Sequence, residues 1–171
     1  MNDIGAPDSH HLNAAQGWLE LGNHSEANEE LAKISASLGD HPEVLEVRWA
    51  IHAAGKCWPT CVEVAEALVK VAPDYLLGWI HRSYALHELK RTQEAFDLLL
   101  PSTSLFPEEP LIRYNLACYS CQLGKPKEAL DWLEKALALG DYKQFRLMAL
   151  EDPDLQPLKA EILKLAKSSQ R

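Results

Sequence analysis

The stretch PLIRYNLACYSCQLGKPKEALDWLEKALALGDYK, residues 110–143, repeats its apolar side chains at spacings of three and four residues. This spacing gathers apolar side chains on one face of a helix, and no sustained alternating run typical of a strand is present. Gly124 interrupts the pattern, and Pro126 follows two residues later. Glycine just past a helix end and proline at the next beginning are common helix boundaries. The stretch therefore predicts two helices joined by a tight turn.

The same pattern recurs along the chain with a period of 34 residues. One set of positions at this spacing holds small side chains, and a second set holds mostly leucine. The sets are Ala27, Cys61, Ala95 and Ala129, and Leu31, Ala65, Leu99 and Leu133. Two helices approach closely only where small residues lie at their crossing, so we place the first set there. The breaks follow the same period, with Gly22, Lys56, Lys90 and Gly124 at matching positions.

Paired helices with a period of 34 residues resemble the tetratricopeptide-repeat (TPR) family. Residues 110–143 are the best match, because Leu116-Ala117, Gly124, Ala129, Leu133 and Ala136 stand where that family places small and apolar packing residues. The resemblance implies an all-α, right-handed superhelix, an α-solenoid of four helix hairpins. Their bounds are 8–41, 42–75, 76–109 and 110–143, with a flexible N-terminus at 1–7.

Residues 144–171 are expected to form C-terminal capping helices followed by a frayed tail. A stacked hairpin buries its outer face only against a neighbour, so the last repeat needs such a cover. Asp152 is placed to cap the final helix, and Pro153 suits its first position. Leu155, Leu158, Ile162 and Leu165 form the apolar stripe expected of this helix.

In the TPR family, the first helix of each repeat lines a concave groove that binds partners. The resemblance assigns groove positions in repeats three and four to Leu77, Ile80, His81, Tyr84, His87, Glu88, Leu111, Tyr114, Asn115, Cys118 and Cys121. Exposed aromatic and aliphatic side chains concentrated in one concavity favour a binding surface, and we expect Tyr84 and Tyr114 to be its anchors. The alternative is that some of these side chains pack against each other or against a chain terminus.

The charge of the chain narrows the class of partner. The formal net charge is −8, and the ionised groove residues are acidic, including Glu20, Glu43, Glu46 and Glu88. The cationic residues with which some family members grip a chaperone's C-terminal carboxylate are missing, since those positions hold Leu12, Gln16, Val47, Leu77 and His81. The predicted partner is a protein or peptide with apolar anchors and basic flanks.

Other partner classes fit the composition poorly. Lysines and arginines are scattered rather than clustered, which argues against nucleic acid. No apolar stretch approaches the ~18 residues of a membrane-spanning helix, so no membrane insertion is expected. The start of the sequence has neither the basic nor the apolar region of a secretory signal. Four cysteines in this length do not suggest a disulfide scaffold, and we expect a cytoplasmic location.

Cys118 and Cys121 lie one turn apart and allow three interpretations. As small apolar residues, they line the groove and let a partner approach the backbone. As a redox pair, they would need a helix N-terminus to lower a thiol pKa, whereas they fall in mid-helix. As metal ligands, they would have His87 as a lateral neighbour, but zinc prefers four ligands and no fourth is evident. The first interpretation is favoured, and no metal or cofactor is expected.

The sequence predicts a non-enzymatic scaffold for protein–protein interaction. It contains no glycine-rich phosphate loop, no HExxH motif and no nucleophile elbow. Within the class of binding proteins, the alternative is a dedicated chaperone or assembly factor for a secreted or membrane protein. From another class, the alternative is a metal-binding or redox module at Cys118, Cys121 and His87.

Overall fold

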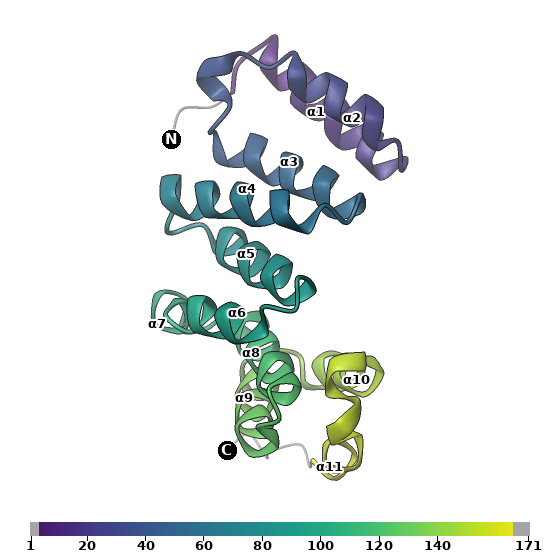
Figure 1. Cartoon of the computed structure of the whole chain (residues 1–171), viewed down its shortest axis with the longest axis vertical. Helices are drawn as coiled ribbons and strands as arrows, with labels where there is room; N and C mark the ends of the chain where they lie inside the picture. Colours follow the sequence, from purple (N-terminus) through teal and green to yellow (C-terminus); the bar gives the residue numbers. More distant parts are fainter. Residues whose placement is uncertain (1–3, 166–171) are drawn as a thin grey trace. The chain divides into compact units, whose positions relative to one another are not determined.

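The computed structural model describes residues 4–165 of the 171-residue chain. The described residues form helices and turns and contain no strand, which confirms the predicted all-α class. They divide into two compact units, one ending at Leu89 and the other beginning at Lys90, and each is described by itself (Figure 1). Residues 1–3 of the predicted flexible N-terminus, and the predicted frayed tail at 167–171, lie outside the described residues.

The first unit is built from helices packed in chain order. Its elements are α1 (Asp8–Glu20), α2 (His24–Ala32), the 3-10 turn η1 (Ala36–Leu38), α3 (Pro42–Ala54), α4 (Trp58–Val71) and α5 (Leu76–Glu88). Helix α1 packs on α2, α3 packs on α4, and α4 packs on α5. Helix α3 also contacts both α1 and α5. The first helices of the three N-terminal repeats are therefore neighbours within this unit.

The second unit centres on α8. Its elements are α6 (Thr92–Leu99), α7 (Ser102–Leu105), α8 (Pro110–Gln122), α9 (Pro126–Leu139), α10 (Tyr142–Glu151), the 3-10 helix η2 (Pro153–Leu158) and α11 (Lys159–Lys164). Helix α8 contacts α6, α7, α9 and η2. The chain breaks between α6 and α7 at Pro101, because proline lacks a backbone N–H and its ring obstructs a continuing helix.

The 34-residue period is a period of the backbone as well as of the sequence. The small-residue positions Ala27, Cys61, Ala95 and Ala129 are all 0% exposed. The matching turn residues all have positive φ: 75° at Gly22, 54° at Lys56, 63° at Lys90 and 73° at Gly124. Glycine adopts this left-handed conformation without steric cost, whereas the two lysines do so under strain. Each hairpin therefore turns at the same point relative to its helix crossing.

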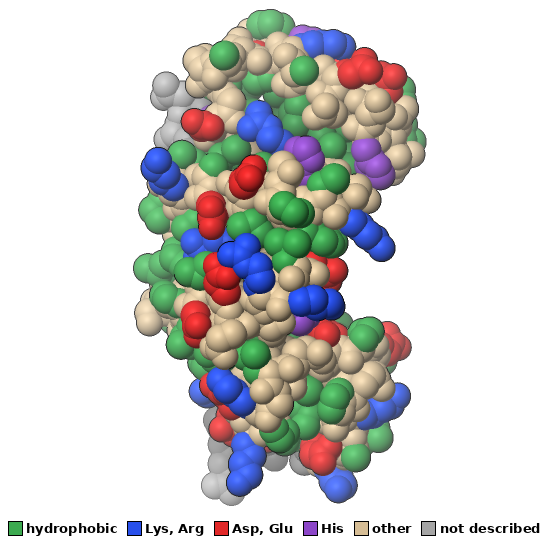
Figure 2. All heavy atoms as spheres, in the orientation of Figure 1, with side chains coloured by type: hydrophobic (Ala, Val, Ile, Leu, Met, Phe, Trp, Pro, Cys, Tyr) green, Lys and Arg blue, Asp and Glu red, His purple; other side chains and the backbone are tan. Residues whose placement is uncertain are grey.

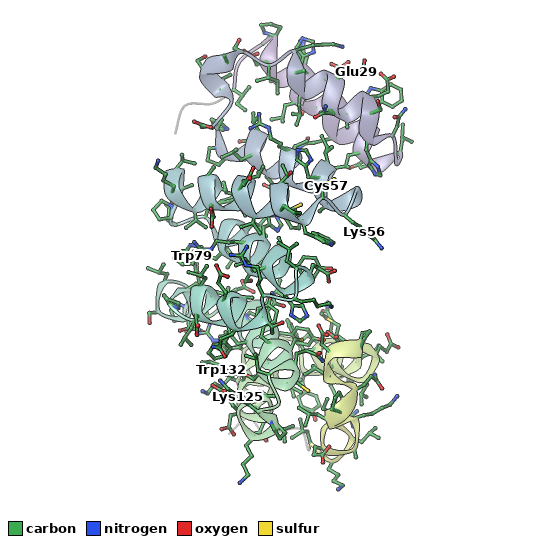
Figure 3. The ribbon with its side chains drawn as sticks, in the orientation of Figure 1. Glu29, Lys56, Cys57, Trp79, Lys125 and Trp132 are labelled. Carbon is green, nitrogen blue, oxygen red and sulfur yellow. The ribbon has the colours of Figure 1, made fainter. Side chains whose placement is uncertain are left out.

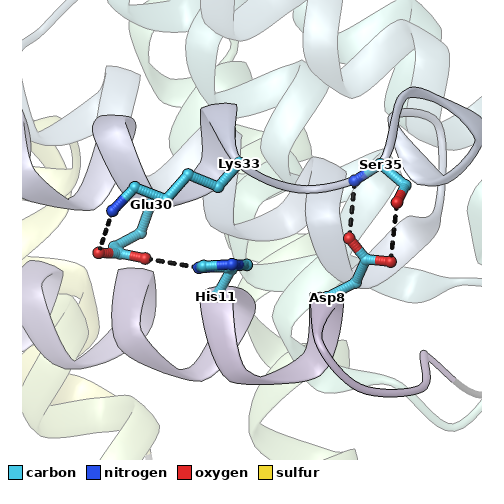
Figure 4. Close-up of polar contacts among 5 residues, drawn as sticks. All are labelled: Asp8, His11, Glu30, Lys33 and Ser35. Atoms are coloured by element: carbon cyan, nitrogen blue, oxygen red, sulfur yellow. Dashed lines mark hydrogen bonds and ion pairs between the residues drawn. The ribbon is translucent and has the colours of Figure 1, made fainter.

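Polar contacts fix the first hairpin in addition to its apolar core (Figure 4). The Asp8 carboxylate at the start of α1 accepts from the Ser35 backbone N–H at 2.7 Å and from the Ser35 hydroxyl at 3.0 Å. One turn along α1, His11 Nδ1 lies 2.8 Å from Glu30 Oε2, and Lys33 donates to the other carboxylate oxygen of Glu30 at 2.7 Å. Hydrogen bonds from Lys33 and then His11 lower the pKa of Glu30. These contacts join α1 to the C-terminal half of α2 and to the turn that follows it.

The buried crossing generates a stability prediction. Ala129→Leu inserts three extra carbon atoms where no exposed surface remains, so we expect a loss of roughly 1–3 kcal/mol in the free energy of unfolding. Lys127→Leu on the exposed side of the same helix is the matched control and should cost far less. Urea unfolding followed by circular dichroism measures both, and equal midpoints for the two variants would contradict the 34-residue register.

Candidate functional site

The predicted groove residues of repeat three lie on α5, in the first unit. Helix α5 approaches α4 closely at Gly78, which has no side chain. A Cβ atom there would be only 3.1 Å from Val69 Cγ2 and 3.2 Å from Leu68 Cγ. Ile80 and His87 are buried, whereas Leu77, His81 and Glu88 are half-buried. Tyr84 is the most open of the set, with 41% of its surface exposed. Of the predicted α5 residues, Tyr84 is thus the one most accessible to a partner.

Tyr84 belongs to a cluster of four aromatic side chains, which we call the aromatic cluster: Trp49, Trp58, His81 and Tyr84. The rings of Trp49 and His81 stack with centroids 3.8 Å apart and an interplanar angle of 6°. Tyr84 meets Trp49 at 6.5 Å and Trp58 at 5.6 Å, in both cases edge to face. Burial lowers the pKa of His81 to about 4, so that its ring is neutral at neutral pH. Stacked and edge-to-face aromatic contacts of this kind hold their members in fixed orientations.

Sequence reasoning did not place Trp49 and Trp58 beside Tyr84. The sequence feature that could have indicated this contact is the size of Trp49. The equivalent positions of the other repeats hold the small residues Ala15, Ser83 and Ala117. A side chain of this size cannot fit into a helix crossing, and in the structure it reaches α5 and stacks on His81 instead. Its indole Nε1 is buried and has no hydrogen-bond partner among the described residues.

Two alanines, a tryptophan and one carboxylate share the side of the first unit on which Tyr84 lies, as the equivalent positions of α3 and α5 and the Trp58 contact indicate. We call this surface the Tyr84 face, and define it by Ala50, Ala53, Trp58, Tyr84 and Glu88. Ala50 and Ala53 are half-buried on α3, and Glu88 is half-buried one turn after Tyr84 on α5. Hydrophobic side chains follow the line where α4 meets α5 in Figure 2. The Tyr84 face thus combines an exposed aromatic ring, alanine side chains that leave room for a partner, and a carboxylate.

A second carboxylate, that of Glu46 on α3, is held in place by a hydrogen bond. The Tyr75 hydroxyl, just before α5, donates a hydrogen bond to Glu46. Burial, followed by the contact with Glu46, raises the pKa of Tyr75 to about 12, so that the hydroxyl remains a donor. This bond orients the Glu46 carboxylate on the side of α3 that contacts α5.

The predicted groove residues of repeat four lie on α8, and the C-terminal segment covers several of them. Tyr114, Cys118 and Cys121 are 4%, 5% and 9% exposed. The Tyr114 hydroxyl donates to Asp152 Oδ2 at 2.8 Å, and its ring meets Phe145 of α10 edge to face at 5.8 Å. The prediction that Tyr114 is an open anchor is therefore wrong. Leu111 and Asn115 are half-buried.

The covering segment combines apolar burial with polar contacts. Leu155, Leu158 and Ile162 are at most 4% exposed, whereas Leu165, the fourth residue of the predicted stripe, is half-buried. The side chain of Asp152 accepts from the Asp154 N–H at 2.9 Å, so the predicted cap is present. It caps the 3-10 helix η2 rather than an α-helix. Gln122 of α8 adds a bond from Nε2 to the Asp154 carbonyl at 2.8 Å.

The two cysteines of α8 have the properties of packing residues. Burial and then the nearby Asp152 raise the pKa of the Cys118 thiol well above its usual range, and burial also raises that of Cys121. Cys118 Sγ lies 3.5 Å from Asp152 Oδ2, a contact that needs the protonated thiol. Within residues 4–165, no three His, Cys, Asp or Glu side chains form a group that could hold a metal ion. High thiol pKa values do not suit redox chemistry.

One curated protein with a similar sequence is the type IV pilus assembly protein PilF of Pseudomonas aeruginosa. The two are 32% identical over 146 residues, which is 81% of this chain and 55% of PilF. The chain thus spans about half the length of this relative. No family model matches the sequence.

Solved structures with the same fold include MamA from Desulfovibrio magneticus RS-1, which has a TM-score of 0.72 and 17% identity over 99% of this chain and all of that one. A thermophilic TPR protein from Thermus thermophilus has a TM-score of 0.67 and 21% identity over 92% of this chain and all of its own. The chain therefore has the fold of TPR solenoids, as its sequence predicts. Among the described helices, none has the length and apolar character needed to cross a membrane.

The burial of Tyr114 predicts its effect on stability. Tyr114→Ala removes a buried ring and its bond to Asp152, so we expect a loss of about 3 kcal/mol in the free energy of unfolding. Tyr114→Phe, the matched control, removes only the hydroxyl and should cost about 1 kcal/mol. Urea unfolding distinguishes them, and an unchanged midpoint for Tyr114→Ala would mean that the C-terminal segment does not cover α8.

The four cysteines should differ sharply in reactivity. Cys57 is exposed, whereas burial raises the pKa of Cys61 to about 11 and also raises those of Cys118 and Cys121. A higher pKa means less thiolate at a given pH, so iodoacetamide at about pH 8 should rapidly modify one thiol per native chain. Mass spectrometry should locate it at Cys57, and Cys57→Ser should remove the fast phase. Rapid modification of Cys118 in the native protein would contradict its burial.

Proposed function

We propose that this chain is a non-enzymatic scaffold that binds a peptide or helix of a partner protein on the Tyr84 face. The observation that supports this most directly is Tyr84 itself, a large side chain that stays 41% exposed although two tryptophans hold it in place. Fixed and accessible aromatic side chains are common anchors of protein interfaces. The adjoining Ala50 and Ala53 keep the α3 side of this surface low, which lets a partner backbone approach.

The site is assigned to α3 and α5 rather than to α8 for an energetic reason. A partner on the corresponding side of α8 would first have to displace the C-terminal segment. That step would uncover Leu155, Leu158 and Ile162, and re-exposing each costs about 1.5–3 kcal/mol. It would also break the bond between Tyr114 and Asp152. On α5, Tyr84 is already exposed and Leu77, His81 and Glu88 are half-buried, whereas the buried Ile80 and His87 would not contact a partner directly.

The proposed partner segment carries apolar anchors and basic flanks. Glu46 and Glu88 lie on the sides of α3 and α5 that the repeat assigns to binding, and the chain as a whole carries a formal charge of −8. Complementary charge speeds encounter and excludes acidic competitors more than it adds affinity. The apolar anchor would rest on Tyr84 and the alanines, with the basic residues beside the carboxylates.

A second candidate function is that of a dedicated assembly factor or chaperone for a secreted or membrane protein. Its support is the similarity to PilF, which is a type IV pilus assembly protein. Solenoids of this class use extended surfaces to hold partners, and an assembly factor is one use of such a surface. The predicted cytoplasmic location belongs to this proposal, and identification of the captured partner would distinguish an assembly role from a general scaffold.

Partner capture from the native cell should depend on Tyr84. Tyr84→Ala removes the anchor, for which we expect a loss of about 2 kcal/mol, or roughly thirtyfold in affinity. Trp18→Ala is the matched control, because Trp18 is a similarly exposed aromatic residue, 37% against 41%, at a repeat position outside the predicted groove. Unchanged melting would show that both variants are folded. Normal capture by Tyr84→Ala, with loss in Trp18→Ala, would overturn the proposed site.

A further inference from the structure

We propose that the Tyr84 face contains a specific subsite for an arginine side chain of the partner, in which the guanidinium stacks on Tyr84 and pairs with Glu88. This inference rests on the proposed function and names the chemistry of one contact within it. A partner with basic flanks needs only a negative surface, whereas a subsite requires a fixed ring and a carboxylate at adjacent positions. The first unit supplies both on one helix.

The ring is held ready for stacking. Trp49 and Trp58 meet Tyr84 at interplanar angles of 65° and 79°, so that two indoles support the phenol. Trp49 is itself fixed by its parallel stack on the neutral His81 ring. The exposed surface of Tyr84 therefore belongs to a ring that cannot turn away without disrupting the aromatic cluster. Because the ring is already ordered, binding a cation to it would cost little side-chain conformational entropy.

The chain already uses this contact elsewhere on the same helix. The Arg82 guanidinium lies 4.9 Å from the centroid of Trp79, which is labelled in Figure 3. In the second unit, Lys135 lies 4.1 Å from the Trp132 centroid. These distances are within the range at which a ring attracts a cation. Side chains of the arginine and lysine type thus pack on aromatic rings of this fold.

Glu88 supplies a negative charge near Tyr84 on α5, and the exposed Lys90 follows it by two residues, in the turn after the helix. Glu88 follows Tyr84 by four residues, so it lies one turn away on the same side of α5. The positions that match Tyr84 and Glu88 in α3 and α1 hold Ala50, Ala54, Gln16 and Glu20, and none of these is basic. Lys56, the basic residue nearest to Trp58 in sequence, points outward from the turn before α4 (Figure 3).

The geometry favours arginine over lysine. A guanidinium is planar, so one face can stack on the Tyr84 ring while its edge donates to the Glu88 carboxylate. An ammonium is a compact, strongly hydrated charge and gains less from a flat aromatic surface. An aliphatic anchor would also pack on Tyr84, but it would offer no charge to Glu88 and would be insensitive to salt.

The test is a titration of the full chain with N-acetylarginine amide, followed through the NMR signals of the indole N–H groups and the tyrosine rings. N-acetylcitrulline amide is the matched probe, because it has nearly the same shape without the charge, and N-acetylleucine amide represents an apolar anchor. We expect saturable shifts of the Trp58 signal with the arginine probe, and affinity roughly three- to fivefold weaker with citrulline. Added salt should reduce this difference.

Variants assign the two contacts. Tyr84→Leu should lower the affinity for the arginine probe to that for the citrulline probe. Tyr84→Phe keeps the ring face and should retain the preference for arginine. Glu88→Gln should lower the affinity for the arginine probe but not for the other two probes. Glu63→Gln, an exposed control on α4, should leave the affinity for the arginine probe unchanged. Equal binding of arginine and citrulline, preference for leucine, or no effect of Tyr84→Leu would each overturn the inference.

The outcome also separates this inference from the proposed function. If the arginine probe shows no preference while Tyr84→Ala loses its partner, the scaffold proposal stands and the arginine subsite does not. If the probe binds as expected while Tyr84→Ala captures its partner normally, Tyr84 binds a cation but not an arginine of the partner, and both the proposed site and the subsite are overturned.

Discussion

Two helices can cross at contact distance only where neither carries a large side chain, and the rest of this fold depends on that constraint. The constraint recurs every 34 residues, and Ala27, Cys61, Ala95 and Ala129 meet it without any exposed surface. Since the hairpins α1–α2, α3–α4 and α8–α9 each turn at the same left-handed residue and bury the same small position, their equivalent residues have comparable surroundings. Differences between repeats at one position then reflect what each repeat packs against or binds.

The parts of the structure that the sequence predicts are those that repeat. The helix pairs, the crossing and the turns follow from local spacing that recurs four times, and recurrence distinguishes them from chance. The contacts that the sequence does not reveal occur once and join distant positions. Tyr114 and Asp152 are 38 residues apart, and the stack of Trp49 on His81 joins different repeats. No periodic pattern predicts such contacts. The large Trp49 at a position of small residues nevertheless indicates that an unusual contact is present there.

The pair Cys118 and Cys121 illustrates the same limit. Their spacing suggests metal or redox chemistry, but spacing alone does not show what covers a helix. Nine residues of α8 are buried, because α9 and η2 both pack on it. A helix enclosed in this way needs small side chains where the covering segment passes, and cysteine serves as a small apolar residue. The raised pKa values of both thiols are a consequence of that enclosure.

Helices α5 and α8 distribute bulk and polarity in opposite ways. The repeat pairs Ile80 with Tyr114 and Tyr84 with Cys118. The small Cys118 leaves room for Asp152, whereas a tyrosine at that position would occupy the same space. Their polar groups also differ, since Tyr114 and Gln122 donate to the C-terminal segment, and Glu88 on α5, when ionised, can only accept. The acidic residues of the segment 151–154 suit the donors of α8. In the proposed interface, the charge of Glu88 would disfavour an acidic partner segment by repulsion and favour a basic one by complementarity.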